Sequence, residues 1–319
     1  MPYRFEPGRI YRMPTHFGAA PGPRQIPAEA NADPARSPRK ILVSASFLTE
    51  GQALERHIPE RFALAGEPVV TVEFHYMTDI DWLAGRGYTM IHVWWPVVFH
   101  GERDRVVGRF LAVMWENLAD PIITGRGEIG QPKLFADIPE LRLVDGVDHC
   151  EASWMGFRFL DLQVSERHEP QTEPPGPQLE GTLMLKYVPR TGAWGQADIC
   201  QVSFTPGKTP SLTVESRKPA NGTVKFHRAT WQDLPTMYHV VNALADLPVL
   251  SPRRHQLLSR EAASRTATSG YWSNAFAVAG RLGAVAQGGL GMPSARRLPR
   301  GDRLPRQRDG TTNDVSALS

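Results

Sequence analysis

One lysine is placed where it could act as a nucleophile. Lys133 follows Pro132 and precedes three apolar residues, Leu134 to Ala136. If this stretch is buried, desolvation disfavours the charged ammonium and lowers the pKa of the lysine. A neutral lysine amine attacks ketones and forms a Schiff base. Most lysines with apolar neighbours extend their amine to water instead, so the pattern alone does not establish this chemistry.

Three carboxylates and an arginine are candidate partners for this lysine. Glu128 lies five residues before Lys133, and Glu73 and Glu116 are the other candidate proton-transfer groups. Each of the three can equally be a surface or hydrogen-bonded carboxylate. Arg126 can bind a substrate carboxylate through two parallel hydrogen bonds, or it can pair with one of the glutamates.

Aromatic residues on predicted strands are candidates for lining a ligand site, although most strand aromatics belong to the core. Lys186, which alternates with apolar neighbours, is the second candidate for an imine-forming lysine, with a structural role favoured over it. The catalytic candidates are Lys133, Glu128 and Glu73. The substrate-binding candidates are Arg126, Tyr88, Trp95, Gln131 and Glu116.

The sequence supports neither a dinucleotide-binding motif nor a common metal-binding motif. The segment 125–130 matches GxGxxG, but a dinucleotide site needs a helix to open at that turn. Pro132 and Pro139 would interrupt such a helix, and the β-rich surroundings offer no βαβ crossover. The ten histidines form no HExxH or HxH pair. We therefore predict neither a nicotinamide or flavin site nor a metal site.

The elements that must position these residues are mostly strands. The 28 glycines and 28 prolines among 319 residues indicate many turns. Closely spaced strand-like runs predict an antiparallel sheet or barrel. We expect helices at 49–58 (capped by Thr49), 234–245 and 253–263. Strands are expected at 40–47, 68–77, 88–95, 109–115, 121–124, 153–160, 181–188, 197–204, 211–217 and 222–228.

Composition divides the chain into three parts. Residues 1–39 are rich in proline and glycine and predict an extended N-terminal arm. Residues 40–265 predict one β-dominated α+β domain. Residues 266–319 predict a partly or wholly disordered tail, in which seven arginines and three aspartates give a charge of +4. Because the whole chain carries +3, the rest is nearly neutral, which argues against a nucleic-acid-binding body.

The two cysteines, Cys150 and Cys200, do not form a CxxC pair, which excludes a zinc ribbon and a disulfide framework. The sequence has neither the apolar core of a signal peptide at its start nor an apolar run of 18 residues. We therefore expect a cytoplasmic protein with no membrane partner.

Several stretches resemble the acetoacetate decarboxylase superfamily, in matching order and spacing. The most specific is the segment 125–137, which contains Gln131, Pro132 and Lys133 and is similar to the active-site block of that family. Glu116 and Asn117 precede it. The other similar stretches are 53–60 followed by 68–74, then 184–189, 242–249 and, more loosely, 11–18.

The resemblance implies a β-barrel or cone with a few peripheral helices, an imine-forming lysine at Lys133, no cofactor, and assembly into a homo-oligomer. Glu73 matches a carboxylate of the family. Other positions depart from it: Leu134 stands where decarboxylases have a second lysine, and Met90 stands where they have a glutamate. The family's arginine for the substrate carboxylate falls at Arg39 or Lys40.

The sequence thus predicts a cofactor-independent lyase that acts on a small keto acid through a Schiff base on Lys133. Members that lack the second lysine include enzymes of aldol condensation and dehydration, so we favour that chemistry over decarboxylation of a β-keto acid. The alternative is a non-catalytic barrel that binds a keto acid or hydrophobic ligand, since a fold can be retained when its catalytic activity is lost.

Overall fold

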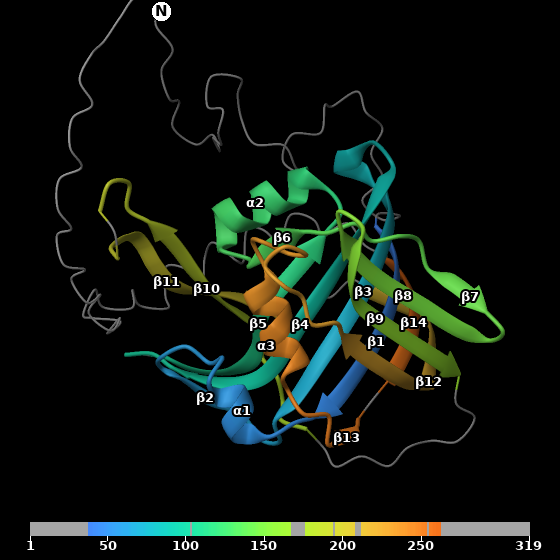
Figure 1. Ribbon diagram of the computed structural model, residues 1–319, viewed down its shortest axis with the longest axis horizontal. Coiled ribbons are helices and arrows are strands. Elements are labelled where there is room, and N and C mark those ends of the chain that lie inside the picture. Colours follow the sequence, from blue (N-terminus) through green and yellow to red (C-terminus); the bar gives the residue numbers. More distant parts are fainter. Residues whose placement is uncertain are drawn as a thin grey trace, which may run out of the picture. The chain divides into compact units, whose positions relative to one another are not determined.

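The structure, a computed structural model, describes residues 38–102, 104–166, 176–193, 195–207, 212–253 and 255–262 (Figure 1). Nearly all of the predicted arm at 1–39, and all of the predicted tail at 266–319, lie outside these residues. The described elements belong to one compact unit.

The unit is built on one large sheet. Its strands follow the order β11-β10-β5-β4-β3-β1-β14-β12-β9-β8-β7, and three short strands join at the sides: β2 on β4, β6 on β5 and β13 on β1. The first strands along the chain are β1 (Arg39–Leu48), β2 (Phe62–Leu64), β3 (Val69–Ile80), β4 (Arg86–His100), β5 (Arg105–Glu116), β6 (Lys133–Phe135) and β7 (Arg142–Val144). The later ones are β8 (Val147–Trp154), β9 (Phe157–Glu166), β10 (Gly181–Pro189), β11 (Ala197–Pro206), β12 (Leu212–Phe226), β13 (Ser251–Pro252) and β14 (His255–Ala262).

Alternation along β3, β4 and β5 gives the sheet two different faces. One face is the main hydrophobic core, to which β3 contributes Val70, Val72 and Phe74. The other face carries polar residues and a small apolar cluster of Leu111, Met114, Ile129 and Met184. We call this second face the polar face.

The two longer helices lie on opposite faces of the sheet. Helix α3 (Tyr238–Ala245) packs Val241 and Leu244 into the main core, and Met237 before it accepts a hydrogen bond from Trp115 Nε1 at 3.4 Å. Helix α2 (Ala119–Ile129) lies over β6 (Figure 1) and places Ile129 in the small cluster of the polar face. The third helix, α1 (Gly51–Glu55), is a short turn after β1.

Most of the predicted strands are confirmed, but four local predictions are wrong. The run 121–124 is part of helix α2, and β14 (His255–Ala262) stands where a helix was expected at 253–263. The strand expected at 153–160 is a hairpin whose turn residues, Met155 and Gly156, both have positive φ. The helix at 49–58 shortens to α1, and Thr49 does not cap it; Glu50 is at the N-cap without a side-chain hydrogen bond.

The sheet is not a closed barrel in the described part of the chain. No ladder joins the end strands β11 and β7 there, so the barrel expectation is corrected to an open, mostly antiparallel sheet. Closure depends on strand tilt and stagger summed over the whole sheet, which local alternation does not encode. The resemblance to the family fold is otherwise retained.

A parallel crossover, which the sequence did not predict, lies in the middle of the sheet. Strands β5 and β6 are parallel neighbours, and α2 connects them. This β5-α2-β6 unit was missed because β6 has only three residues and α2 contains Pro121 and two glycines, which lower helix propensity.

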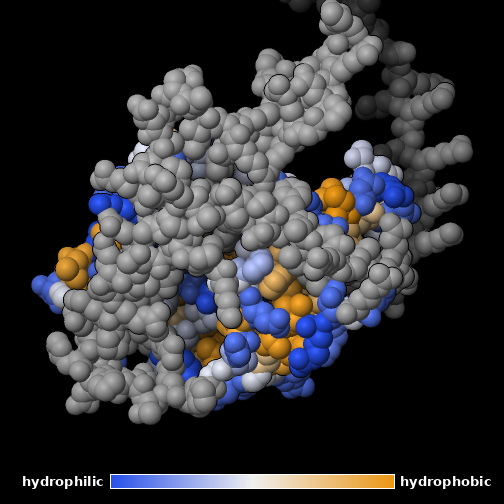
Figure 2. All heavy atoms as spheres, turned by 180° about the vertical axis from the view of Figure 1, so that it is seen from behind, coloured by the Kyte–Doolittle hydropathy of each residue, from blue (hydrophilic) through white to orange (hydrophobic). Residues whose placement is uncertain are grey.

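The described surface mixes hydrophobic and hydrophilic side chains (Figure 2). The most exposed large apolar side chains include Met155 at a hairpin tip and Leu143 on β7. Both cysteines are free, and burial raises the pKa of the Cys150 thiol to about 12. No helix among the described residues is long and apolar enough to span a membrane.

The core contact between Trp115 and Phe159, with ring centroids 5.2 Å apart, joins β5 to β9. Replacing Phe159, which is fully buried, with alanine should lower the free energy of unfolding by about 3–5 kcal/mol, because it leaves a cavity. Leu143→Ala, at a 68% exposed position on β7, should change it by less than about 0.5 kcal/mol. Urea unfolding of the two variants measures the difference, and equal losses would contradict this account of the core.

Candidate active site

Lys133 is the centre of the candidate active site. It opens β6 directly after the turn from α2, and its side chain is only 5% exposed. Its Nζ lies 2.8 Å from Glu116 Oε1 at the end of β5, and it donates a hydrogen bond of 2.9 Å to the carbonyl oxygen of Pro121. The Glu116 side chain is fully buried, so the lysine and the carboxylate form a buried pair.

The burial of this pair changes the proton affinity of both groups. Desolvation lowers the pKa of Lys133 below its ordinary value, and the nearby Glu116 charge partly opposes that shift. Desolvation likewise raises the pKa of Glu116, against the effect of Lys133. Both shifts favour moving the proton from the lysine to the carboxylate. Burial therefore makes the neutral form of each group easier to reach than in an exposed pair.

Helix α2 presents its buried side to the amine. Pro121, Thr124 and Gly125 occupy this side, at the spacing of one helical face. A Cβ atom built on Gly125 would lie 2.7 Å from Lys133 Nζ and 2.2 Å from Gln131 Oε1. Only a glycine lets the helix come this close to Lys133. Because Gln131 Oε1 and Lys133 Nζ both lie near this point, Gln131 is next to Lys133.

Some buried polar atoms around the lysine have no hydrogen-bond partner among the described residues. They are Glu116 Oε2, Gln131 Oε1 and Thr124 Oγ1. Buried polar atoms in proteins are almost always satisfied by protein, water or ligand. These atoms therefore give the surroundings of Lys133 the capacity to bind a small polar molecule.

The C-terminal end of α2 is fixed by the neighbouring hairpin of β10 and β11. Lys186 Nζ donates to the carbonyl oxygens of Gly127 at 2.7 Å and Glu128 at 3.0 Å, and Ser203 Oγ donates to that of Ile129. Gly130, at φ +72°, ends the helix, and a Cβ there would meet the backbone of Lys186 at 2.6 Å. Lys186, the second candidate nucleophile, thus satisfies helix carbonyls.

The other predicted site residues lie in different places. Arg126 donates from one guanidinium nitrogen to the carbonyl oxygen of Lys133 at 2.7 Å, which ties α2 to β6. Glu128 lies near Lys186: burial lowers the pKa of the Lys186 amine, and the Glu128 charge partly opposes that shift. Trp95 packs in the main core against Phe110, on the face opposite the site, so the expectation that it lines the site is corrected. Strand alternation places Trp94 and Tyr88 on the polar face instead.

Glu73 lies on the polar face in a row of residues that crosses four strands. Strand pairing places Glu73 opposite His92, His92 opposite Met114, and Met114 opposite Lys133. Residues opposite one another point to the same side, so Glu73 shares a face with Lys133. At about 4.8 Å per strand, His92 is about 10 Å from Lys133 at the backbone.

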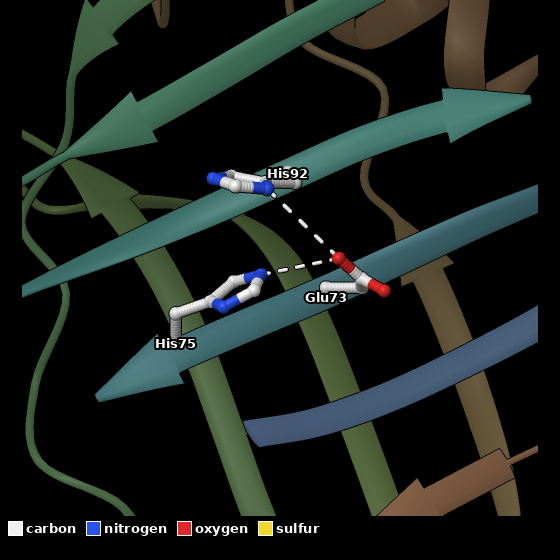
Figure 3. Close-up of side chains that lie close together, drawn as sticks. All are labelled: Glu73, His75 and His92. Carbon is white, nitrogen blue, oxygen red and sulfur yellow. Dashed lines mark hydrogen bonds and ion pairs between the residues drawn. The ribbon is translucent and has the colours of Figure 1, made fainter. Parts of the chain in front are cut away.

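Two histidines beside Glu73 were not among the sequence candidates. His75 Nε2 lies 3.1 Å and His92 Nδ1 3.9 Å from Glu73 Oε2 (Figure 3). Burial, and then His75, hold the pKa of His92 well below its ordinary value. The signal was present: Glu73 and His75 alternate on one predicted strand, and His92 is on the next. The full group depends on the register between two strands, which spacing within one segment does not give.

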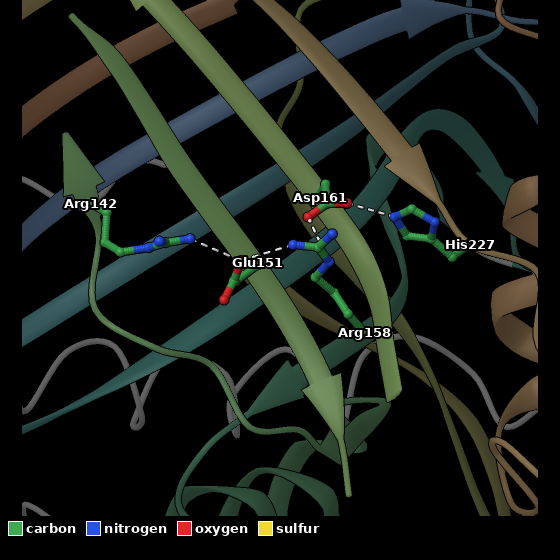
Figure 4. A network of polar contacts seen from close by, with 5 residues as sticks. All are labelled: Arg142, Glu151, Arg158, Asp161 and His227. Atoms are coloured by element: carbon green, nitrogen blue, oxygen red, sulfur yellow. Dashed lines mark hydrogen bonds and ion pairs between the residues drawn. The ribbon is translucent and has the colours of Figure 1, made fainter. Parts of the chain in front are cut away.

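A second polar network lies at the far end of the sheet, on β7, β8 and β9 (Figure 4). Glu151 pairs with Arg142 at 3.0 Å and with Arg158 at 3.4 Å, and Asp161 pairs with Arg158 and His227. Both arginine side chains are 55% exposed. Pairs this exposed are screened by water and contribute little, so we assign them a structural role.

The close approach of α2 predicts a difference between two glycines of the same helix. Gly125→Ala places a methyl group against the end of the Lys133 side chain, which can move aside, so the fold should survive. The rate at which borohydride traps pyruvate or acetoacetate on Lys133 should nevertheless fall about 10- to 100-fold, because the amine is displaced. In the matched control Gly127→Ala, nothing lies within 4 Å of the new methyl group, and the rate should not change. Equal trapping rates in the two variants would show that Gly125 does not position the amine.

Known proteins match the chain over most of its length. The family model described as acetoacetate decarboxylase (ADC) matches residues 12–252. The acetoacetate decarboxylase of Clostridium botulinum (strain Eklund 17B / Type B) is 27% identical over 217 residues, which cover 65% of this chain and 82% of that protein.

Solved structures show the same fold. The acetoacetate decarboxylase of Legionella pneumophila superposes with a TM-score of 0.53 at 18% identity, covering 73% of this chain and 86% of that one. The enduracididine biosynthesis enzyme MppR, complexed with the condensation product of pyruvate and imidazole 4-carboxaldehyde, has a TM-score of 0.53 at 14% identity, with coverages of 70% and 85%. The fold and the family match over residues 12–252 agree, and this chain belongs to the acetoacetate decarboxylase family.

Proposed function

We propose that this protein is a lyase that joins a small keto acid to Lys133 as an imine. The observation that carries the proposal is the buried pair of Lys133 and Glu116, with Nζ and Oε1 2.8 Å apart. Family membership supports an enzyme of this general class.

The pair supplies both proton-transfer needs of imine formation. The neutral Lys133 amine attacks the carbonyl carbon of the substrate, and a carbinolamine forms. Glu116, as the carboxylic acid, gives its proton to the departing hydroxyl group, and water leaves. The products are a protonated imine on Lys133, one water molecule and the Glu116 carboxylate, so atoms and charge balance.

The protonated imine then serves as an electron sink for one of two reactions. Loss of carbon dioxide from a β-keto acid places the released electron pair on the imine, as in a decarboxylase. Loss of a proton next to the imine gives an enamine, which attacks an aldehyde in an aldol condensation. An activated lysine nucleophile of this kind is already known from acetoacetate decarboxylase itself. Because Leu134 stands where decarboxylases have a second lysine, we favour condensation and dehydration.

Borohydride trapping tests this function directly. The protein is incubated with pyruvate, acetoacetate or a larger β-keto acid, reduced with borohydride, and analysed by intact mass and peptide mapping. We expect one adduct per chain, on Lys133, and none in Lys133→Ala, with circular dichroism confirming that the variant is folded. An adduct only on another lysine, or no adduct from folded protein, would refute the imine. An adduct without release of product would favour the alternative of ligand binding without turnover.

The pH dependence of trapping tests the role of burial. Because burial lowers the pKa of Lys133, the trapping rate should rise with pH and reach half its maximum below pH 10.5, the ordinary lysine value. It should fall again at higher pH, where the pair has lost the proton that Glu116 gives to the departing hydroxyl group. The Glu116 charge raises the pKa of Lys133, so Glu116→Gln should move this midpoint further down. The same variant should lower the maximum rate, because the proton donor is lost. A midpoint at or above 10.5, or an upward shift in Glu116→Gln, would contradict the proposed pair.

A further inference from the structure

A compact set of metal-ligating side chains lies on the polar face, apart from Lys133. Glu73 and His75 come from β3 and His92 from β4 (Figure 3). One potential ligand atom from each residue lies within 4.8 Å of the others. Among the described residues, no other group of three histidine, cysteine or acidic side chains has this arrangement.

The sheet itself brings the three side chains together. Glu73 and His75 are two positions apart on β3 and therefore point to the same side. His92 is the register partner of Glu73 on β4. The two imidazole rings lie with their centroids 4.2 Å apart, and a nitrogen of each faces the same oxygen, Glu73 Oε2. Regular strands fix these positions more firmly than a loop would.

We propose that Glu73, His75 and His92 bind a divalent transition-metal ion such as Zn²⁺. Two imidazoles and one carboxylate form a ligand set that suits zinc or iron(II) and does not suit magnesium or calcium, which prefer oxygen ligands. With metal–ligand bonds of about 2.0–2.2 Å, the three ligand atoms need to approach to roughly 3–3.5 Å of one another. The pair His75–Glu73 is already at 3.1 Å and the pair His92–Glu73 is at 3.9 Å, and all three ligand atoms lie within 4.8 Å of one another. Binding therefore requires the two imidazoles to rotate toward each other.

The burial of the three ligands favours a specific site. Glu73 and His75 are each less than 10% exposed as residues, and the His92 side chain is 22% exposed. Three protein ligands leave at least one coordination position open for water or a small anion. His92 is on the same face of the sheet as Lys133, two strands away. The metal site does not depend on imine formation, so either proposal can fail without the other.

Cobalt binding provides the test, because Co²⁺ occupies zinc sites and gives visible absorption bands that report its ligands. The full-length protein, without an affinity tag and after treatment with a chelator, is titrated with Co²⁺ and then with Zn²⁺. We expect one Co²⁺ per chain, visible bands of a four- or five-coordinate ion, and displacement by one equivalent of Zn²⁺. Zn²⁺ should also raise the Tm of the wild-type protein.

Variants identify the ligands. His92→Gln and Glu73→Gln should each weaken Co²⁺ binding at least about 100-fold, since loss of mere supporting groups already costs 10- to 100-fold. His100→Gln is the matched control, because His100 is on the same strand, is exposed and lies outside the cluster. It should bind Co²⁺ like the wild type. Absence of the visible bands in wild-type protein, or unchanged binding in both cluster variants, would overturn the proposal.

Discussion

The burial of Lys133 beside Glu116 is the interaction on which the rest of the site depends. Neither charge is stable alone in an apolar interior, and removing one partner of a buried pair leaves the other uncompensated. The two groups therefore require each other structurally while remaining able to exchange a proton. The same burial that makes the pair costly to stability is the source of the shifted proton affinities that the proposed chemistry uses.

Helix α2 packs against Lys133 through Pro121 and Gly125, and other contacts fix the helix on both sides. Arg126 ties it to β6, and Lys186 with Ser203 ties its C-terminal end to the β10–β11 hairpin. The cationic amine of Lys186 lies where the helix dipole is negative, which is favourable. The segment 125–130, which matches GxGxxG, lies at the end of this helix and not at its start. Two of its glycines, Gly125 and Gly130, allow neighbouring groups to pack closely against the helix.

Lys133 was singled out by the resemblance of the segment 125–137 to the family's active-site block, and its role stays a prediction. The sequence also predicted most of the sheet, since alternation and turn residues mark antiparallel strands clearly. The sequence did not predict α2, because Pro121, Gly125 and Gly127 weaken the helical pattern. It also did not predict the pairing of Lys133 with Glu116, because that pairing requires the parallel contact of β5 with a three-residue strand. The groupings of Glu73 with His92 and of Lys186 with the end of α2 depend on strand register and tertiary packing. Neither can be read from spacing within one segment.

The order of the strands has a consequence for how the molecule folds. Strands β3, β4, β5 and β6, with α2 between the last two, are consecutive in the chain and also neighbours in the sheet. Contacts between segments so near in sequence close short loops and lose little chain entropy. Strand β1, by contrast, pairs on its other side with β14, more than 200 residues later. Low loop-closure cost thus favours early assembly of residues 69–135, which carry the lysine and its partners, ahead of the long-range half of the sheet.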